Sequence, residues 1–372
     1  MNAAPRKSVS PVIVAGIRAV LGLFQVLYSI ARLIPAPDRI VFLSRQANQA
    51  TPDILALQTE LTERHGASNI VVLARKMNSD RDLFYGLHLL RQVWHIAHAR
   101  RIILDSYSFL TSNLRLRAGT SVIQMWHAIG SLKRFGWDDL PANNPRRRQL
   151  ADALRMHAGN TTVIASSERA AVNFASAFKT DRSRVVVSPL PRVDLILGGA
   201  DNDSGATPRE WFDVAHSQQV LLVAPTLHSE LEDPDNGLLD RITELGEARD
   251  WLVWRSFHPV SNPIRQAYST AELLADANAF LTDKSSMIYE AGLRGIPGFL
   301  WAPPPEQAAL FAESYPTEAE LRPLIVESAE ELFEALADPA RRAAATEFAK
   351  NYVDVDSPRS ATERLAAIIA SS

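Results

Sequence analysis

The sequence of 372 residues contains no cysteine, which excludes disulfide bonds, thiolate nucleophiles and cysteine-based zinc or iron–sulfur sites. It also lacks the G-x-G-x-x-G and P-loop patterns, and this disfavours a dinucleotide or ATP site. The nine histidines are scattered and show no metal-ligand spacing, so we expect neither a bound metal nor a cofactor. The net charge of −3 gives no general attraction to nucleic acid, so we expect no nucleic-acid partner and only local anion sites.

The composition and the length of the chain indicate an ordered protein of about two domains. Hydrophobic residues make up 47% of the chain and charged residues 22%, a balance typical of globular proteins. A chain of this length is too long for one ordinary core.

The N-terminal region is almost continuously apolar from Val12 to Ile34. Because a spanning helix would bury two arginines, the pattern predicts an amphipathic helix that lies in a membrane plane. Basic residues on both sides favour the anionic inner face of the cytoplasmic membrane, with the protein cytoplasmic and peripheral. A helix packed on the protein itself or in a homo-oligomer is the alternative, and a signal peptide is disfavoured because no small-residue cleavage site follows. The polar residues that form one stripe are Arg18, Gln25, Ser29 and Arg32.

From Arg39 onward, short Val/Ile-rich strands alternate with helical patterns, which predicts parallel sheets and an α/β fold. The strands are expected at 39–43, 69–74, 101–104, 121–125, 162–165, 184–187, 219–223, 251–255, 279–281 and 298–301. The polar run at 198–210 predicts a linker. We therefore expect a helix at 1–37, a first Rossmann-like domain at 38–198, a linker at 199–210, a second Rossmann-like domain at 211–350 and a final helix at 351–372.

The segment QMWHAIGSLKRFG, residues 124–136, follows one of these strands. Ligands in open α/β sheets bind at the carboxyl ends of strands, so His127, Lys133 and Arg134 are candidates for chemistry on an anion, with Gly130 in the loop. A histidine that only makes a structural hydrogen bond is the competing interpretation.

A second candidate segment, LTDKSSMIYEAGLRGIP at 281–297, predicts a strand, a turn and a helix. Ser285 and Ser286 would place two hydroxyls and free backbone N–H groups at the helix start, where a diphosphate binds well. Asp283 and Glu290 belong to the same candidate site. An ordinary helix N-cap is the alternative.

Three further strand ends hold candidate ligands. Arg255 and His258 end one strand, and Thr226 ends another. Arg192 could clamp a phosphate while Asp194 orients it, and an ion pair between these two residues is the alternative.

Taken in order, these segments resemble the CDP-glycerol glycerophosphotransferase family of teichoic-acid primases and polymerases. The resemblance implies a GT-B fold with two Rossmann-like domains facing a cleft, a CDP-linked polyol donor and a lipid-linked acceptor. It also implies His127 as general base and His258, Ser285 and Ser286 as ligands of the donor phosphates. The segments are RIVFLSRQAN, LDSYS, QMWHAIGSLKRFG, VIASSERAAVNFASAF, LPRVD, APT, HP and TDKSSMIYEAGLRGIP, between Arg39 and Pro297.

The reaction expected from this resemblance is transfer of glycerol phosphate, or a related polyol phosphate, to a hydroxyl of a lipid-linked glycan or phosphopolymer, with release of CMP. His127 and His258 are the expected catalytic residues. Pro189, His228 and Phe257 depart from the family pattern and leave the identity of the polyol open. A GT-B glycosyltransferase that uses a nucleotide sugar, and a non-catalytic membrane scaffold of the same fold, remain alternatives.

Overall fold

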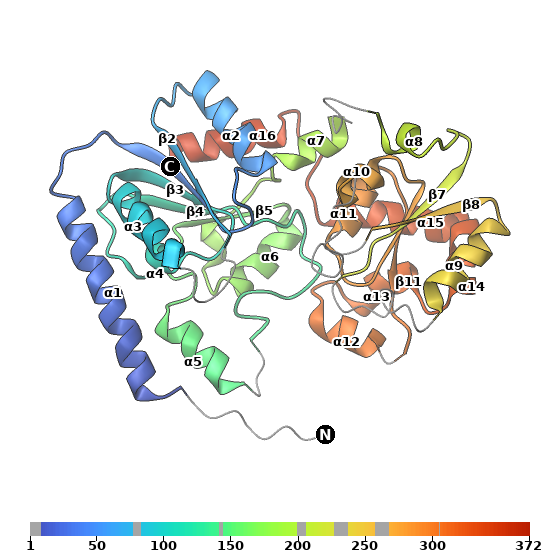
Figure 1. Cartoon of the computed structure of the whole chain (residues 1–372), viewed down its shortest axis with the longest axis horizontal. Helices are drawn as coiled ribbons and strands as arrows, with labels where there is room; N and C mark the ends of the chain where they lie inside the picture. Colours follow the sequence, from blue (N-terminus) through green and yellow to red (C-terminus); the bar gives the residue numbers. More distant parts are fainter. Residues whose placement is uncertain are drawn as a thin grey trace. The chain divides into compact units, whose positions relative to one another are not determined.

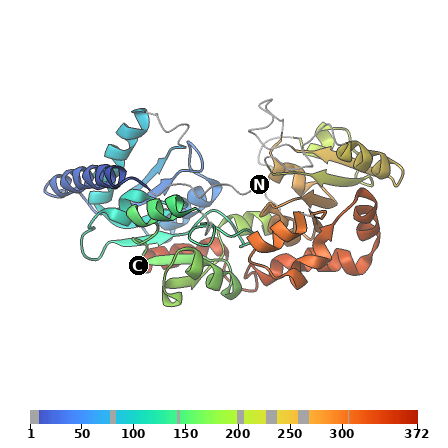
Figure 2. The ribbon, with the colours of Figure 1, turned by 90° about the horizontal axis from the view of Figure 1, so that it is seen from below.

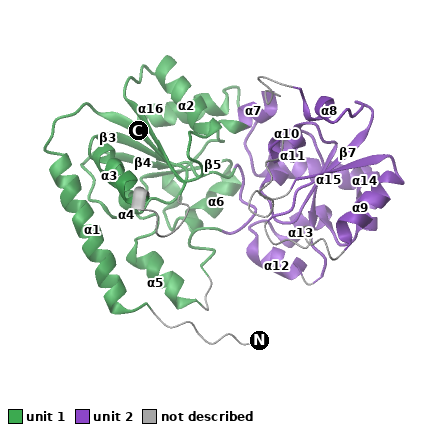
Figure 3. Cartoon of the chain, viewed as in Figure 1, with its two compact units in different colours: residues 1–128, 135–192, 356–372 green, residues 129–134, 193–355 purple. Residues whose placement is uncertain are grey.

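The computed structural model describes residues 9–76, 83–140, 144–198, 206–226, 237–256, 268–304 and 306–372. The chain divides into two compact units, each built on one parallel sheet (Figure 3). Unit 1 comprises Met1–Ala128, Phe135–Arg192 and Asp356–Ser372, and unit 2 comprises Ile129–Arg134 and Val193–Val355.

Unit 1 contains a six-stranded sheet in the order β2-β1-β3-β4-β5-β6 (Figure 1). The strands are short and apolar because helices cover both faces of the sheet. They are β1 Arg39–Ser44, β2 Ile70–Ala74, β3 Ala99–Leu104, β4 Ser121–Gln124, β5 Thr162–Ala165 and β6 Val185–Val187. The helices are α1 Pro11–Ala31, α2 Pro52–Glu63, α3 Leu83–Ala97, α4 Phe109–Asn113, α5 Pro145–Ala153, α6 Glu168–Ala177, the 3₁₀ helix η1 Arg182–Arg184 and α16 Ala361–Ser371.

The strand order places α2 and α3 on opposite faces of this sheet. The β1–α2–β2 connection runs toward one edge and the β2–α3–β3 connection runs back, and both crossovers of a parallel sheet are right-handed. The helix α1 packs on α3, and α16 packs on α2. Figure 2 shows α1 and α16 on opposite sides of the sheet of unit 1.

Unit 2 contains a five-stranded parallel sheet in the order β11-β10-β9-β7-β8. Its strands are β7 Gln219–Val223, β8 Trp251–Arg255, β9 Ala279–Thr282, β10 Gly298–Trp301 and β11 Ile325–Val326. Its helices are α8 Pro208–Trp211, α9 Leu238–Glu247, α10 Thr270–Ala275, α11 Met287–Leu293, α12 Glu306–Glu313, α13 Glu318–Leu321, η4 Arg322–Leu324, α14 Ala329–Ala337, α15 Pro339–Glu347 and η5 Phe348–Asn351. The helix α7, Arg192–Gly198, begins at the last residue of the middle part of unit 1 and continues into unit 2.

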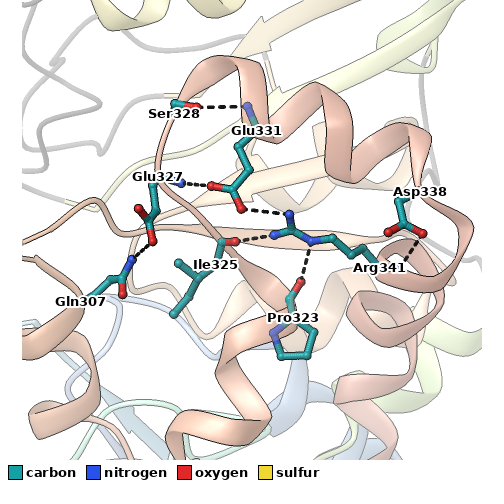
Figure 4. A network of polar contacts seen from close by, with 8 residues as sticks. All are labelled: Gln307, Pro323, Ile325, Glu327, Ser328, Glu331, Asp338 and Arg341. Carbon is teal, nitrogen blue, oxygen red and sulfur yellow. Dashed lines mark hydrogen bonds and ion pairs between the residues drawn. The ribbon is translucent and has the colours of Figure 1, made fainter.

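A polar network joins the last helices of unit 2 to β11 (Figure 4). The Arg341 guanidinium on α15 donates to the carbonyls of Pro323 and Ile325 and pairs with Glu331 of α14 at 2.9 Å. Asp338 caps the start of α15 by accepting from the backbone N–H of Ala340. These bonds fix the two helices against the sheet edge.

The helix α1 is packed on unit 1 along one face. Tyr28 and Ala31 are buried, Phe24 meets Phe109 edge to face at 5.9 Å, and the Tyr28 hydroxyl accepts from the backbone N–H of Arg117 at 3.0 Å. The predicted N-terminal helix is therefore present, and its last turns contribute Tyr28 and Ala31 to the core of unit 1. The same helix is long and apolar enough to cross a membrane by length and composition.

The ten predicted strands are all present, with ends within one or two residues of the expected positions. The two-residue strand β11 was missed because it is too short to show a period. Residues 199–205 of the predicted linker lie outside the described residues. The end of this run is structured, because α8 begins with a Thr207–Glu210 capping box and Arg209 is 6% exposed.

Two expected domain boundaries also differ from the compact units. Residues 129–134 belong to unit 2, although they were expected in the first domain. The cause is backbone pairing with the end of α12: the Arg134 N–H donates to the Glu313 carbonyl at 2.7 Å, and the Tyr315 N–H donates to the Leu132 carbonyl at 2.9 Å. Residues 351–355 belong to unit 2 and Asp356–Ser372 to unit 1.

Candidate active site

His127 follows the carboxyl end of β4 in unit 1, as the sequence predicted. The residue before it, Trp126, has φ of 63°, a left-handed backbone conformation that bulky side chains rarely adopt. The Trp126 ring is held by stacking on Phe135 at 5.1 Å and by an edge contact with Phe178 at 5.4 Å. The aromatic packing thus fixes a strained turn that directs the backbone at His127.

The imidazole of His127 is oriented through its Nδ1 atom. Nδ1 lies 2.9 Å from the Asp105 backbone carbonyl, which can only accept, so Nδ1 carries the proton and donates it. The Gln46 amide nitrogen also lies 3.1 Å from this ring nitrogen, but as a donor it cannot bond to Nδ1 in this tautomer, and the shorter contact with the carbonyl decides the assignment. This arrangement leaves Nε2 with a lone pair, which is the state required of a general base.

Burial lowers the pKa of His127 below its usual value of 6.5. The Asp105 carbonyl and carboxylate act in the opposite direction, and the Arg192 guanidinium adds to the lowering. Burial also raises the pKa of the Asp105 carboxyl group, against hydrogen bonds from Ser44 and Ser106. His127 is therefore neutral near pH 7 and able to accept a proton.

A second group of polar side chains gathers at the carboxyl ends of β7 and β9 in unit 2. Asp283 accepts from the Thr226 backbone N–H at 2.7 Å and from its hydroxyl at 2.5 Å, so one carboxylate ties the two strand ends together. Lys133 lies close enough for Asp283 to raise the pKa of its ammonium group, although burial among neighbouring atoms lowers that pKa overall. We call Lys133, Thr226, Asp283, Lys284, Ser285 and Ser286 the Asp283 cluster.

The helix predicted after this strand begins two residues later than expected, at Met287. The Ser285 hydroxyl accepts from the Met287 N–H at 3.3 Å, and Ser286 is the exposed N-cap residue without a side-chain capping bond. Glu290 lies in the first turn and is half-buried. Because α11 has seven residues, the hydroxyls and the lysines provide more for an anion here than the helix dipole does.

Residues 129–134 bring Lys133 and Arg134 into unit 2. Lys133 forms an antiparallel bridge with Ser314, and the Arg134 Nε donates to the Ser314 carbonyl at 3.3 Å. Gly130, a predicted substrate-site residue, packs closely against α11, and a Cβ atom on it would lie 2.5 Å from Tyr289 Cε2. Its lack of a side chain allows the segment to lie on α11.

Arg192, a predicted phosphate ligand, is paired with Asp53 of α2 in the structure. Its Nε and backbone N–H donate to the buried carboxylate of Asp53, both at 2.8 Å, and a second guanidinium nitrogen reaches the same carboxylate at 2.5 Å. The donors of the Arg192 guanidinium are therefore engaged within unit 1. A buried carboxylate such as that of Asp53 requires a counter-charge. Asp194 lies half-buried in the first turn of α7.

Arg255 is also engaged locally, because its guanidinium donates to Thr243 of α9 at 2.8 Å and reaches Asp240 at 3.4 Å. His258 lies outside the described residues. Sequence reasoning missed Asp105 and Gln46 as neighbours of His127, although both lie directly after predicted strands. Among the described residues, no group of three or more His, Asp or Glu side chains is arranged to hold a metal ion.

The sequence profile of the CDP-glycerol:poly(glycerophosphate) glycerophosphotransferase family matches residues 26–233, more than half of the chain. The chain belongs to this family. Its predicted membership and its class, a phosphotransferase of the CDP-glycerol glycerophosphotransferase type, are confirmed.

Among relatives within the family, the teichoic acid ribitol-phosphate primase of Bacillus spizizenii is 26% identical over 313 residues, which cover 77% of this chain and 79% of the primase. The teichoic acid glycerol-phosphate primase of Bacillus subtilis is 24% identical over 231 residues, 57% of this chain and 58% of the primase. The poly(ribitol-phosphate) polymerase of Bacillus spizizenii is 25% identical, and the chain spans about half of its length, 47%.

Solved structures show the same fold. The wall teichoic acid polymerase TagF superposes with a TM-score of 0.69 at 17% identity, covering 95% of this chain and 94% of the other. The UDP-GlcNAc 2-epimerase of Neisseria meningitidis, bound to UDP-GlcNAc, has a TM-score of 0.58 at 14% identity and covers 91% and 100%. The predicted GT-B fold class with two Rossmann-like units is confirmed.

Proposed function

We propose that this family member transfers a polyol phosphate, glycerol phosphate in the first instance, from a CDP-linked donor to a hydroxyl of a lipid-linked glycan or phosphopolymer and releases CMP. The observation that supports it most is the state of His127: Nδ1 is committed to the Asp105 carbonyl, and burial lowers the pKa so that Nε2 can accept a proton at neutral pH. The family to which the chain belongs supports the donor class.

In the proposed reaction, the acceptor hydroxyl gives its proton to His127 Nε2 while its oxygen attacks the β-phosphorus of the donor. The bond between that phosphorus and the oxygen bridging to the α-phosphate breaks, and CMP leaves with the bonding electrons. Negative charge then grows on the departing and equatorial oxygens. Stabilisation of this charge, together with positioning of the two substrates, provides most of the rate enhancement in phosphoryl transfer.

The Asp283 cluster is suited to stabilising the negative charge on the phosphate oxygens of the donor. Lys133 supplies positive charge, and Ser285 and Ser286 supply hydroxyl donors, on the backbone that Asp283 fixes to Thr226. Lys284 pairs with Glu313 at 2.9 Å, so its charge is shared with that carboxylate. We propose that these groups bind the donor diphosphate. Arg134, Asp194, Arg255, Glu290 and His258 remain predicted substrate or catalytic residues, while Arg192 is proposed to act through its charge near His127.

The proposed site of action is the inner face of the cytoplasmic membrane. The outer side of α1 presents exposed apolar side chains, whereas its other side is packed on unit 1. An exposed apolar helix face next to basic residues favours insertion at an anionic lipid surface. The exposed residues of α1 are Val12, Ile13, Val20, Leu23, Val26 and Ile30, and Leu33 and Ile34 are exposed directly after the helix.

The test supplies purified protein with CDP-glycerol, CDP-ribitol, UDP-sugars and GDP-sugars in turn, with membrane extract as acceptor. CMP release and label transfer to the lipid phase with a CDP-polyol support the proposal. Release of UDP or GDP instead favours a sugar transferase, and ligand-induced thermal stabilisation without CMP formation favours a non-catalytic scaffold.

Replacement of His127 by alanine gives the matched test of the base. A general base contributes about 10²- to 10⁴-fold to the rate, so CMP release should fall by that factor while donor binding persists. Unchanged CMP release in the His127→Ala protein would remove the assignment.

A further inference from the structure

A basic cavity of about 340 Å³ lies in unit 1 at the carboxyl end of the edge strand β2. Its walls are formed by the end of β2, by Asn48 after β1 and by His88 and Arg91 on α3. The Asn48 amide oxygen accepts from the Lys76 N–H at 2.9 Å and so fixes the floor of the cavity. Neither His127 nor any residue of the Asp283 cluster is among the described residues that line this cavity.

The charged side chains among the described residues of the cavity wall are all cationic. Three cationic side chains line it, those of Arg75, Lys76 and Arg91, and none of the described residues around it is acidic. Within the described parts of the chain, neither Lys76 nor Arg91 forms an ion pair, and both side chains are exposed toward solvent. Positive charges gathered in a concave surface focus the electrostatic potential and attract anions.

His88 also lines this basic cavity. Its Nε2 atom is buried and has no hydrogen-bond partner among the described residues. Burial lowers its pKa, and the charges of Arg75 and Arg91 lower it further. An oxyanion in the cavity would provide the missing partner for this atom and offset the cationic charges.

The cavity and His127 both lie at the carboxyl ends of the strands of unit 1. The loop after β1 reaches both places, because Gln46 contacts His127 and Asn48 lines the cavity. In the strand order β2-β1-β3-β4, the two sites are three strand spacings apart, about 14 Å. A linear acceptor whose hydroxyl lies at His127 can therefore extend along the strand ends to the cavity.

We propose that this cavity binds a phosphate group of the acceptor at a fixed distance from the attacking hydroxyl. The inference rests on the proposed function, since it concerns the acceptor of that reaction. The phosphate belongs either to a polyol-phosphate repeat or to the diphosphate of a lipid-linked acceptor, and both offer the same oxyanion. A cationic site so placed would hold the acceptor in register and select phosphate-bearing acceptors over neutral alcohols.

The first test measures binding by calorimetry in the absence of donor. The probes are a soluble glycerol-phosphate oligomer and inorganic diphosphate, and the variant is Lys76→Gln with Arg91→Gln. Loss of two charge-assisted contacts should weaken binding at least tenfold. Arg100→Gln with Arg184→Gln removes the same charge from exposed positions at the opposite ends of the strands and should bind as the unchanged protein does.

The second test measures transfer. The cavity variant should show a KM for phosphate-bearing acceptors raised at least tenfold, with the donor KM and the donor-only hydrolysis rate unchanged. An effect confined to the oligomeric acceptor identifies a polyol phosphate, and one confined to the lipid acceptor identifies its diphosphate.

Equal binding and equal acceptor KM in the cavity variant and the charge-matched control would overturn the proposal while leaving the proposed reaction intact. If the unchanged protein releases no CMP from any CDP-polyol, the proposed function fails instead, and the calorimetry still decides whether the cavity binds phosphate.

Discussion

Gly130 lies so close to the ring of Tyr289 that a Cβ atom on the glycine would be 2.5 Å from Tyr289 Cε2. The ring is fully buried and stacks on Phe348 at 5.5 Å with an interplanar angle of 14°, so it cannot move aside without disturbing the core of unit 2. This contact determines how closely residues 129–134 approach α11, and so where Lys133 lies relative to Asp283. We therefore expect Gly130 to contribute by positioning Lys133.

We expect Gly130→Ala to lower the free energy of unfolding by about 1–3 kcal/mol, the usual effect of an extra carbon in a packed site. It should also raise the donor KM, because Lys133 is displaced from the Asp283 cluster. Urea unfolding and CMP-release kinetics measure the two effects. Gly86→Ala is the control: Gly86 lies in α3 with open space around it, so the change should stabilise by about 0.5–1 kcal/mol. Equal stability and donor KM in the two variants would contradict this role of Gly130.

The pH dependence of the rate should follow the state of His127. A general base is inactive when protonated, so kcat/KM should fall as the pH decreases through its pKa. Because burial lowers that pKa, the midpoint of the fall should lie below 6.5. Asp105→Asn removes a negative charge that favours the imidazolium, so the midpoint should move to still lower pH. A pH–rate profile with CMP release as readout checks both; a midpoint that rises in the variant would show that Asp105 acts otherwise.

We expect the removal of Arg192 to destabilise the protein more than the removal of the charge on Asp53. Arg192→Gln leaves the Asp53 carboxylate, which is 1% exposed, without its counter-charge, and should lower the free energy of unfolding by about 3 kcal/mol. Asp53→Asn should cost less, because the Arg192 side chain is 28% exposed and water can solvate it. The double variant should recover part of the loss seen with Arg192→Gln. Denaturant titrations of the three proteins decide this, and equal losses in the two single variants would refute the asymmetry.

Membrane binding should depend on the exposed face of α1. Replacing Leu23, Val26 and Ile30 by glutamine should reduce cosedimentation with anionic vesicles by tenfold or more, because apolar area buried in the lipid interface is lost. The melting temperature should stay within a few degrees, since these side chains are more than half exposed in the protein. Glutamine at Leu55, Leu87 and Val172, which are equally exposed elsewhere on unit 1, provides the matched control. Equal loss of vesicle binding in both triple variants would exclude a specific role of α1.

Much of the fold could be predicted because its signals are local. Short apolar runs between turn residues located every strand longer than two residues, and the alternation with helices indicated parallel sheets. The short helices α4, α7, α8, α10 and α13 were missed, because four to seven residues show too little of a helical period.

The positions of the candidate site residues could be predicted from the sequence, but the partners of several of them could not. His127, Lys133, Thr226, Asp283, Ser285 and Ser286 lie at strand ends, which the sequence reveals. Arg192, Arg255 and Gly130 have the right residue types at similar places, yet their partners are Asp53, Thr243 and Tyr289, which lie far from them in the sequence or on a neighbouring element. No periodic pattern encodes such partners.

By itself, therefore, the sequence determined the α/β class, the positions of the strands, the apolar helix at the start and the residue types available for phosphate chemistry, since each follows from local periodicity and composition. The tertiary structure alone decided which of these side chains are already neutralised by a partner and which retain donors or charge. That decision depends on burial and on contacts between distant segments, as when the carbonyl of Asp105 fixes the tautomer of His127.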